Sequence, residues 1–169
     1  MGVLSDTHGR LDSAILDLFA GCDHIIHAGD VGDWTIIERL HAVAPVTAVR
    51  GNCDDSGDLA QLPATATVIL GNVTVLVIHD LLMVEVLGAT AFAAIRAAGR
   101  GVVVSGHTHL AAITRENGVL FLNPGSASLR RYEAPRSVAL LRIGEGECAA
   151  EIHELRRGVS GGKRTQDRG

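Results

Sequence analysis

Short apolar runs alternate with helical patterns through the first fifty residues, and this alternation restricts the fold more than any other feature of the chain. Strands are expected over 3–5, 24–27 and 46–50, because each run is short, aliphatic and followed by polar residues or glycine. Between them, apolar residues recur at helical spacing over 11–19 and 36–43. This β-α-β-α-β order predicts a parallel sheet with helices packed on its faces.

The second half of the chain is richer in strands and in turn signals. Gly71-Asn72 and Asn117-Gly118 are two-residue pairs typical of hairpin turns. One helix is expected over 90–98, and strands over 65–70, 73–79, 101–105, 110–116, 119–122, 137–143 and 148–155. From Arg156 onward apolar residues are scarce, so we expect one domain over 1–155 and a flexible basic tail over 156–169.

Composition excludes several classes of protein. With 47% hydrophobic and 20% charged residues the chain is not wholly disordered, and a net charge of −4 argues against a broad nucleic-acid surface. The three cysteines lack Cys-x-x-Cys spacing, which is typical of reduced thiols in a cytoplasmic protein. No apolar run reaches the length of a membrane span and no secretory signal is visible, so a cytoplasmic location without a membrane partner is expected.

Polar side chains gather where the expected strands end. Five segments carry them: Asp6-Thr7-His8, Gly29-Asp30, Gly51-Asn52, His79 and Gly106-His107-Thr108-His109. Ligands of open α/β sheets bind at the carboxyl ends of the strands, so two Asp, one Asn and four His are expected along one edge. The glycines before Asp30, Asn52 and His107 are expected to let the backbone turn sharply there.

The residue types of this group favour divalent metals. Carboxylate, amide oxygen and imidazole suit Mn, Fe, Zn, Co or Ni, and seven donors exceed the needs of one tetrahedral site. They suit two ions that share a bridging carboxylate. Taken singly, each residue has an ordinary structural role: Asp6 as a helix cap, Asp30 in a turn, His79 in the core. Taken together, metal binding is the better explanation.

The series SDTHG, HAGDVGD, RGNCD, His79 and SGHTH resembles the calcineurin-like metallophosphoesterase family. More narrowly, it is similar to the small single-domain phosphodiesterases of bacteria and archaea, a branch that the Asn-Pro-Gly-Ser pattern at 123–126 also fits. The resemblance covers residues 2–155. It implies an α/β fold of two packed β-sheets flanked by helices, an αββα sandwich.

The resemblance also implies how the catalytic metal ligands are shared. One ion takes Asp6, His8, Asp30 and His109, and the other takes Asp30, Asn52, His79 and His107, so that Asp30 bridges. The ions are expected to be Mn, with Ni, Co, Fe or Zn as alternatives. Water or hydroxide shared by the ions would attack the phosphorus of a phosphodiester.

Two positions depart from the family pattern. The metal His at the place of His79 is commonly followed by Gly and a second His, whereas Asp80 and Leu81 follow here. Asp80 would orient a ligand or repel an anionic one. Many larger members carry His where Cys53 stands, and Cys53 itself is not expected to act as a proton donor or a nucleophile.

Contacts with substrate are expected from Asn52, Cys53 and Arg10. Arg10 and Arg50 both flank the motifs and could contact a phosphate, but an ordinary role as solvated surface charges fits them equally well. Arg130, Arg131 and Arg136 form a candidate basic rim, for which an ordinary exposed surface is the simpler explanation.

Other residues near the motifs are expected to have structural roles. His27 either supports the ligands or only packs, Asp33 caps the second helix, and Asp54 holds a turn in preference to binding a ligand. The pattern at 123–126 is expected to form a turn under the site.

Three functions are compatible with these observations. The leading one is a dinuclear phosphodiesterase acting on a small phosphodiester or nucleotide. The second is a non-catalytic interaction module, as in the small retromer subunit of this fold, where the ligand set is typically incomplete. The third is a phosphomonoesterase or nucleotidase. The complete ligand set favours an enzyme, and a homodimer is compatible with the resemblance.

Overall fold

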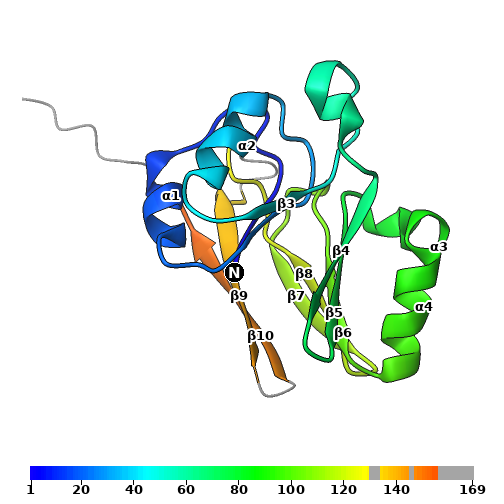
Figure 1. Ribbon diagram of the computed structural model, residues 1–169. Helices are drawn as coiled ribbons and strands as arrows, with labels where there is room; N and C mark the ends of the chain where they lie inside the picture. The colour runs from blue at the N-terminus through cyan, green and yellow to red at the C-terminus, as the bar shows by residue number, and fades with distance from the viewer. Residues whose placement is uncertain (130–133, 145–146, 156–169) are drawn as a thin grey trace, which may run out of the picture.

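Two five-stranded β-sheets lie against each other, with helices on their outer faces (Figure 1). The computed structural model describes residues 1–129, 134–144 and 147–155. The expected basic tail over 156–169, and Arg130 and Arg131 of the candidate rim, lie outside the described residues. The expected αββα sandwich is therefore confirmed.

The first sheet contains the β-α-β-α-β unit. Its strand order is β10-β9-β1-β2-β3, and its elements are β1 (Gly2–Leu4), α1 (Ser13–Phe19), β2 (Ile25–His27), α2 (Trp34–His41), β3 (Val46–Ala48), β9 (Ser137–Gly144) and β10 (Glu147–Glu154). Strands β1, β2 and β3 are parallel as predicted, but β9 pairs antiparallel with β1, so the sheet as a whole is mixed. Strands β1 and β3 end one and two residues earlier than predicted, and the chain leaves the sheet there to form the loops of the site.

Both helices of this unit begin at aspartate caps. The Asp33 carboxylate accepts the Thr35 N–H at 2.9 Å, which confirms its predicted role, and Asp12 does the same for Ala14 at the start of α1. Arg136 forms an ion pair with Asp12, with 3.3 Å between Nη2 and Oδ2. This residue of the candidate rim is therefore engaged in holding the start of α1.

The second sheet has the order β4-β5-β6-β8-β7. Its strands are β4 (Thr65–Leu70), β5 (Val73–Ile78), β6 (Gly101–Val104), β7 (Ala112–Glu116) and β8 (Val119–Asn123). Both predicted hairpins are present, since β4 pairs antiparallel with β5 and β7 with β8. Helix α4 (Ala89–Ala98) matches the prediction, whereas η1 (Gly57–Gln61), η2 (Leu81–Met83) and α3 (Val84–Leu87) were not predicted, because such short turns carry too little periodicity.

Alternate residues of the strands supply separate apolar layers. Val3 and Ile26 lie between the two sheets, while their neighbours Leu4 and Ile25 pack against α1 and α2. Strand β6 does the same, with Val104 between the sheets and Val103 under α4. Strands buried on both faces need continuous apolar runs, which explains the aliphatic composition.

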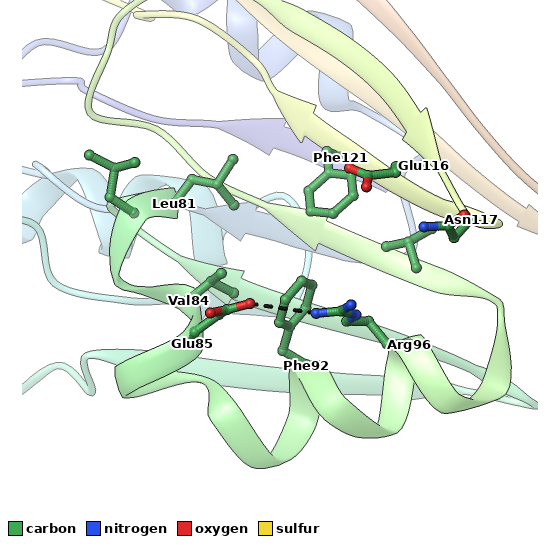
Figure 2. A pocket seen from close by; sticks show the side chains of 10 residues that line it. Leu81, Val84, Glu85, Phe92, Arg96, Glu116, Asn117 and Phe121 are labelled. Atoms are coloured by element: carbon green, nitrogen blue, oxygen red, sulfur yellow. Dashed lines mark hydrogen bonds and ion pairs between the residues drawn. The ribbon is translucent and has the colours of Figure 1, made fainter.

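Part of the outer face of the second sheet is hollow. A cavity of about 550 Å³ lies between η2, α4 and strand β8. Leu81, Val84 and Phe92 line it opposite Phe121, and an ion pair joins Glu85 to Arg96 at 3.5 Å (Figure 2). In the part of the chain that the structure describes, no single helix has the length and apolarity needed to cross a membrane; a bent pair, Leu81–Leu87 with Ala89–Ala98, passes by length and composition alone.

Candidate metal centre

The loops after the strands place the predicted ligands through strained backbone. Five of them have left-handed φ angles: Asp6 (54°), His8 (44°), Asp30 (53°), His107 (67°) and His109 (62°). For residues with a Cβ this conformation costs about 1–3 kcal/mol each and persists where function requires it. The strain is therefore concentrated on the residues expected to bind metal.

The glycines in these motifs serve two purposes. Gly29 has a φ of 91° and makes the predicted sharp turn. Gly51 and Gly106 do not adopt left-handed φ angles, so they contribute in a different way. A Cβ on Gly51 would lie 2.0 Å from Asp30 Oδ1, and one on Gly106 would lie 1.9 Å from Ser5 Oγ. These two glycines allow loops to approach each other closely.

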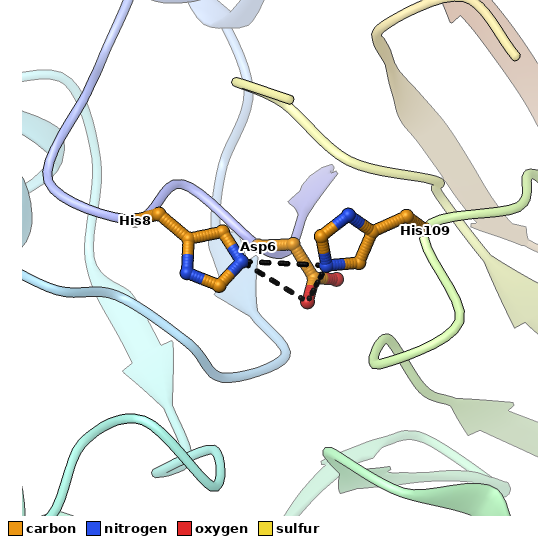
Figure 3. A group of neighbouring side chains, drawn as sticks. All are labelled: Asp6, His8 and His109. Atoms are coloured by element: carbon orange, nitrogen blue, oxygen red, sulfur yellow. Dashed lines mark hydrogen bonds and ion pairs between the residues drawn. The ribbon is translucent and has the colours of Figure 1, made fainter. Parts of the chain in front are cut away.

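A first group of donors consists of Asp6, His8 and His109 (Figure 3). His109 Nε2 lies 3.2 Å from Asp6 Oδ1 and 3.3 Å from His8 Nε2, and His8 Nε2 lies 3.9 Å from Asp6 Oδ1. The two imidazoles and the carboxylate thus point toward one another from loops 101 residues apart in the chain. Burial raises the pKa of Asp6, whose side chain is fully enclosed.

A second group surrounds Asn52. Asn52 Oδ1 lies 3.1 Å from His79 Nε2 and 3.0 Å from His107 Nδ1. His79 Nδ1 donates to the Ala28 carbonyl at 2.8 Å, so the Nε2 atom of the neutral ring holds a lone pair. That lone pair faces Asn52 Oδ1 and, at 3.5 Å, Asp30 Oδ1. Three acceptors therefore converge on one point.

Asp30 lies between the two groups. Its Oδ2 atom is 3.8 Å from His8 Nε2, and its Oδ1 atom is 3.5 Å from His79 Nε2. Burial alone would raise the pKa of Asp30, but the neighbouring His79 ring and a 2.8 Å hydrogen bond from the Cys53 N–H hold this pKa well below its usual range. Each carboxylate oxygen of an ionised Asp30 faces a different group of donors.

This arrangement fits cations. Asp6 Oδ1 is buried and accepts no hydrogen bond from any residue that the structure describes. Although burial lowers the pKa of His79, its contacts with Asp30 and Ala28 outweigh that effect and raise this pKa. The cluster thus attracts positive charge, and its mixture of imidazole, carboxylate and amide oxygen suits transition-metal ions.

Residues behind the ligands hold the loops in place. The Asp54 carboxylate accepts three backbone N–H groups, those of Val31, Gly32 and Gly51, at 2.9–3.0 Å. Its predicted role in a turn is confirmed and extends to joining two of the loops that carry candidate ligands. Because its oxygens are occupied in this way, Asp54 does not face a ligand.

The turn at 123–126 supports the site from below, as predicted. Asn123 Nδ2 donates to the Gly106 carbonyl at 2.7 Å, and Ser126 Oγ and Ser128 Oγ both donate to the Asp6 carbonyl, at 3.0 and 2.9 Å. Ser126 belongs to the Asn-Pro-Gly-Ser pattern, whereas Ser128 lies outside it and has no signal in the sequence, since both contacts span 120 or more residues.

The predicted substrate contacts occupy different places. Cys53 and Asn52 line a hollow of about 280 Å³ together with His8, Asp30, His107, His109 and Leu129. Burial, together with Asp30, raises the pKa of the Cys53 thiol to about 11, so it is neutral at ordinary pH. Arg10 is exposed just after the first loop, and Arg50 donates to the Ala60 carbonyl at 3.4 Å beside a second hollow lined by Asn52 and His79.

His27 supports the loops through a directional hydrogen-bond chain. Its Nδ1 atom accepts the Gly29 N–H at 3.3 Å, so its Nε2–H donates to Thr7 Oγ1 at 2.8 Å, and Thr7 donates in turn to the Val31 carbonyl at 2.9 Å. The ring is fully buried. Burial lowers the pKa of His27 from 6.5 to about 4, and a second ring proton would break the bond from Gly29.

We expect the stability of the metal-free protein to depend on His27 below pH 6.5. Because the folded-state pKa of about 4 lies below the ordinary value, the unfolded chain binds the extra proton first, and stability falls as the pH drops from 6.5 to 4. The loss attributable to His27 is on the order of 3 kcal/mol. Urea unfolding of the wild type and of His27→Gln across this range should give a shallower slope for the variant, and parallel slopes would contradict the expectation.

Comparison with known proteins identifies relatives of this chain. The model of the calcineurin-like phosphoesterase superfamily domain matches residues 1–146. A protein of Methanocaldococcus jannaschii named probable metallophosphoesterase is 35% identical over 144 residues, covering 78% of this chain and 69% of the relative. The phosphodiesterase YfcE of Escherichia coli is 32% identical over 160 residues, covering 81% of this chain and 84% of that protein.

The solved structures with a similar fold include one that is not named as a phosphoesterase. The vacuolar protein sorting 29 protein of Cryptosporidium parvum superposes with a TM-score of 0.67 at 21% identity, covering 92% of this chain and 97% of that one. This similarity concerns the fold alone.

Proposed function

Because the chain belongs to the calcineurin-like phosphoesterase superfamily, we propose that it is a phosphodiesterase that works with two divalent metal ions. The position of Asp30 carries this proposal. One of its carboxylate oxygens faces His8 and the other faces His79, as expected of a residue shared by two ions. The first ion would be held by Asp6, His8, Asp30 and His109, and the second by Asp30, Asn52, His79 and His107.

When bound, two such ions activate water as a nucleophile and neutralise charge on the phosphoryl oxygens. The protein's own part is to hold the seven donors in place before substrate arrives, through left-handed loop residues and the support of Asp54, Ser126 and Ser128. Asn52 and Cys53 are proposed to contact the substrate because they line the hollow at this site. Arg10 is also proposed to contact the substrate, but only because it lies two residues after His8 in the sequence.

The charge of the hollow supports a diester substrate over a monoester. Among the described residues that line it there is no Lys or Arg. A phosphomonoester carries up to two negative charges near pH 7, whereas a diester carries one, so the diester needs less compensation by cationic side chains. The name of the YfcE relative, a phosphodiesterase, points in the same direction.

We further propose Mn as the natural metal and the cytoplasm as the place of action. Imidazole with carboxylate donors accepts Mn, and Ni, Co, Fe and Zn are the alternatives. Cys22, Cys53 and Cys148 are all free thiols, which supports a reducing compartment.

Metal analysis of the purified full chain, followed by activity assays, tests the proposed function. Bis-p-nitrophenyl phosphate and p-nitrophenyl phosphate are compared with Mn, Ni, Co, Zn and Mg added separately. We expect about two ions per chain and faster hydrolysis of the diester. Faster hydrolysis of the monoester would favour a phosphomonoesterase. Bound metal without any hydrolysis would favour the non-catalytic interaction module.

The two metal positions should be separable by mutation. We expect Asn52→Ala and His79→Ala to weaken chiefly one position, and His8→Ala to weaken chiefly the other, because these residues belong to different donor groups. Each variant should retain about one tightly bound ion, measured by elemental analysis after dialysis. Equal loss of both ions in all three variants would refute this partition.

A further inference from the structure

We propose that the substrate is a phosphodiester with one uncharged, apolar arm, and that this arm lies in a separate, apolar hollow on the outer face of the second sheet. The inference rests on the proposed function and specifies its substrate class. This hollow, called here the apolar hollow, has a volume of about 380 Å³. Its walls include Leu81, Leu82, Leu110, Ala112, Thr114 and Phe121.

The apolar hollow adjoins the candidate metal centre. His107 and Gly106 belong to its lining, and His107 also lines the hollow that contains His8, Asp30, Asn52 and His109. The His107 ring itself contacts Asn52 Oδ1 at 3.0 Å. A diester has two arms on the same phosphorus atom, so an arm that leaves the centre past His107 enters the apolar hollow directly.

The charge of the lining selects against a phosphate-bearing or otherwise anionic arm. Asp80 is the one charged side chain among the described residues of this lining, and no Lys or Arg joins it. Asp80 is also committed to the start of η2, where its carboxylate accepts the Leu82 N–H at 3.0 Å. An arm that continues into further phosphates, as in a polynucleotide, would meet a carboxylate and no cation within this lining, and Arg96 of the neighbouring 550 Å³ cavity is already paired with Glu85.

Several apolar side chains that line this hollow stay exposed to solvent in the folded protein. Leu82 is 88% exposed and Leu110 is 44% exposed. The apolar hollow shares Leu81, Leu82 and Phe121 with the 550 Å³ cavity of Figure 2, and its own volume of about 380 Å³ has room for an alkyl or aryl chain. Burying such a chain against these side chains removes apolar surface of both partners from water, which favours binding.

A series of substrates with one leaving group tests the inference. p-Nitrophenyl alkyl phosphates with methyl, butyl and hexyl arms keep the reacting centre constant and vary only the retained arm. We expect kcat/KM of the wild type to rise roughly twofold to fourfold for each added methylene, the upper value corresponding to full burial. Isothermal titration calorimetry with alkyl methylphosphonates, which carry a methyl group in place of the nitrophenolate leaving group, should show the same rise in affinity, with an increasingly negative heat-capacity change.

Two variants and a matched control localise the effect. Leu82→Glu places a second negative charge beside the apolar hollow, and Ala112→Trp fills it from strand β7; each should lower the hexyl-to-methyl ratio of kcat/KM by about tenfold. Ile69→Glu is the control, because Ile69 is 71% exposed on β4 and does not belong to the described lining. It should leave the ratio unchanged.

The outcomes separate this inference from the proposed function. Failure to hydrolyse even the methyl diester with metal bound would overturn the proposed function, and the inference with it. Hydrolysis that is independent of arm length would overturn the inference alone. A dimer of the wild type that Leu82→Glu dissociates, without a change in the ratio, would also overturn it and assign the exposed leucines to an interface between copies of this chain.

Discussion

Replacement of Asp30 by Ala is expected to lower phosphodiesterase activity by about a thousandfold or more and to remove most of both metal ions. The physical reason is that the two oxygens of this one side chain face two groups of donors, so a single truncation opens both positions. Loss of a shared charged ligand is worth several kcal/mol of transition-state stabilisation, and each 1.4 kcal/mol corresponds to about tenfold in rate.

Elemental analysis and single-turnover kinetics on the purified variant check this expectation. Asp30→Asn serves as a second variant, because it retains an oxygen that can accept the Cys53 N–H while removing the charge. Asp33→Ala is the matched control: it removes an exposed carboxylate three residues away, costs about 1 kcal/mol of helix capping, and should leave both ions bound. Two tightly bound ions in Asp30→Ala would refute the bridging role.

The rate of hydrolysis is expected to depend steeply on the leaving group. We expect fast turnover of nitrophenyl diesters and slow turnover of simple alkyl diesters. Apart from any effect of binding, the difference in rate should be about 10²–10⁴-fold, because a positioned acid typically contributes that much. Nitrophenolate leaves without a proton, whereas an alkoxide needs one. The Cys53 thiol, with its pKa raised to about 11, is a poor acid at the place where larger relatives carry His.

The structure weakens the other candidates for a proton donor. His27 is fully buried and its proton is held in the chain to Thr7. The Asp54 carboxylate is occupied by three backbone N–H groups, and Asp80 accepts the Leu82 N–H. These contacts orient the three side chains toward loops of the protein, which is why we expect no efficient protein acid among them.

A series of aryl and alkyl diesters with a common retained arm measures this dependence. The logarithm of kcat/KM should fall steadily as the pKa of the leaving group rises. Cys53→His should flatten the slope if the new imidazole reaches the leaving oxygen, and Cys53→Ser serves as a control for the loss of the thiol. A flat dependence in the wild type, with chemistry shown to limit the rate, would mean that an acid is present.

The order of elements and the residue types of the site could be predicted from the sequence. Strands β1, β2 and β3 and helices α1 and α2 follow from local periodicity, and the hairpins follow from Gly71-Asn72 and Asn117-Gly118. Each of these signals depends on neighbours within a few residues. The convergence of the donors was predicted, but along the edge of one sheet, and that detail is wrong. Asp6, Asp30 and Asn52 follow strands of the first sheet, whereas His79 and His107 follow β5 and β6 of the second, so only the packing of the two sheets brings them together.

The boundaries of the strands and the existence of the short helices were harder to predict from the sequence. Strand β3 ends at Ala48 instead of Arg50, and η2 and α3 were missed. Apart from Glu85, residues 81–87 are all apolar, and only packing over the second sheet determines which of them stay exposed. The apolar hollow beside His107 is a product of that packing, so no pattern in the sequence indicated it.

By itself, the sequence determined the β-α-β-α-β unit, the donor types and their family resemblance, because these depend on local patterns and on short motifs. The tertiary structure alone decided which atoms meet. It set the two oxygens of Asp30 toward different histidines, fixed the His79 tautomer through Ala28, and brought Ser126 under Asp6. The physical reason is that these contacts join residues 22 to 120 positions apart, whose side-chain directions are set by packing and backbone strain and not by local periodicity.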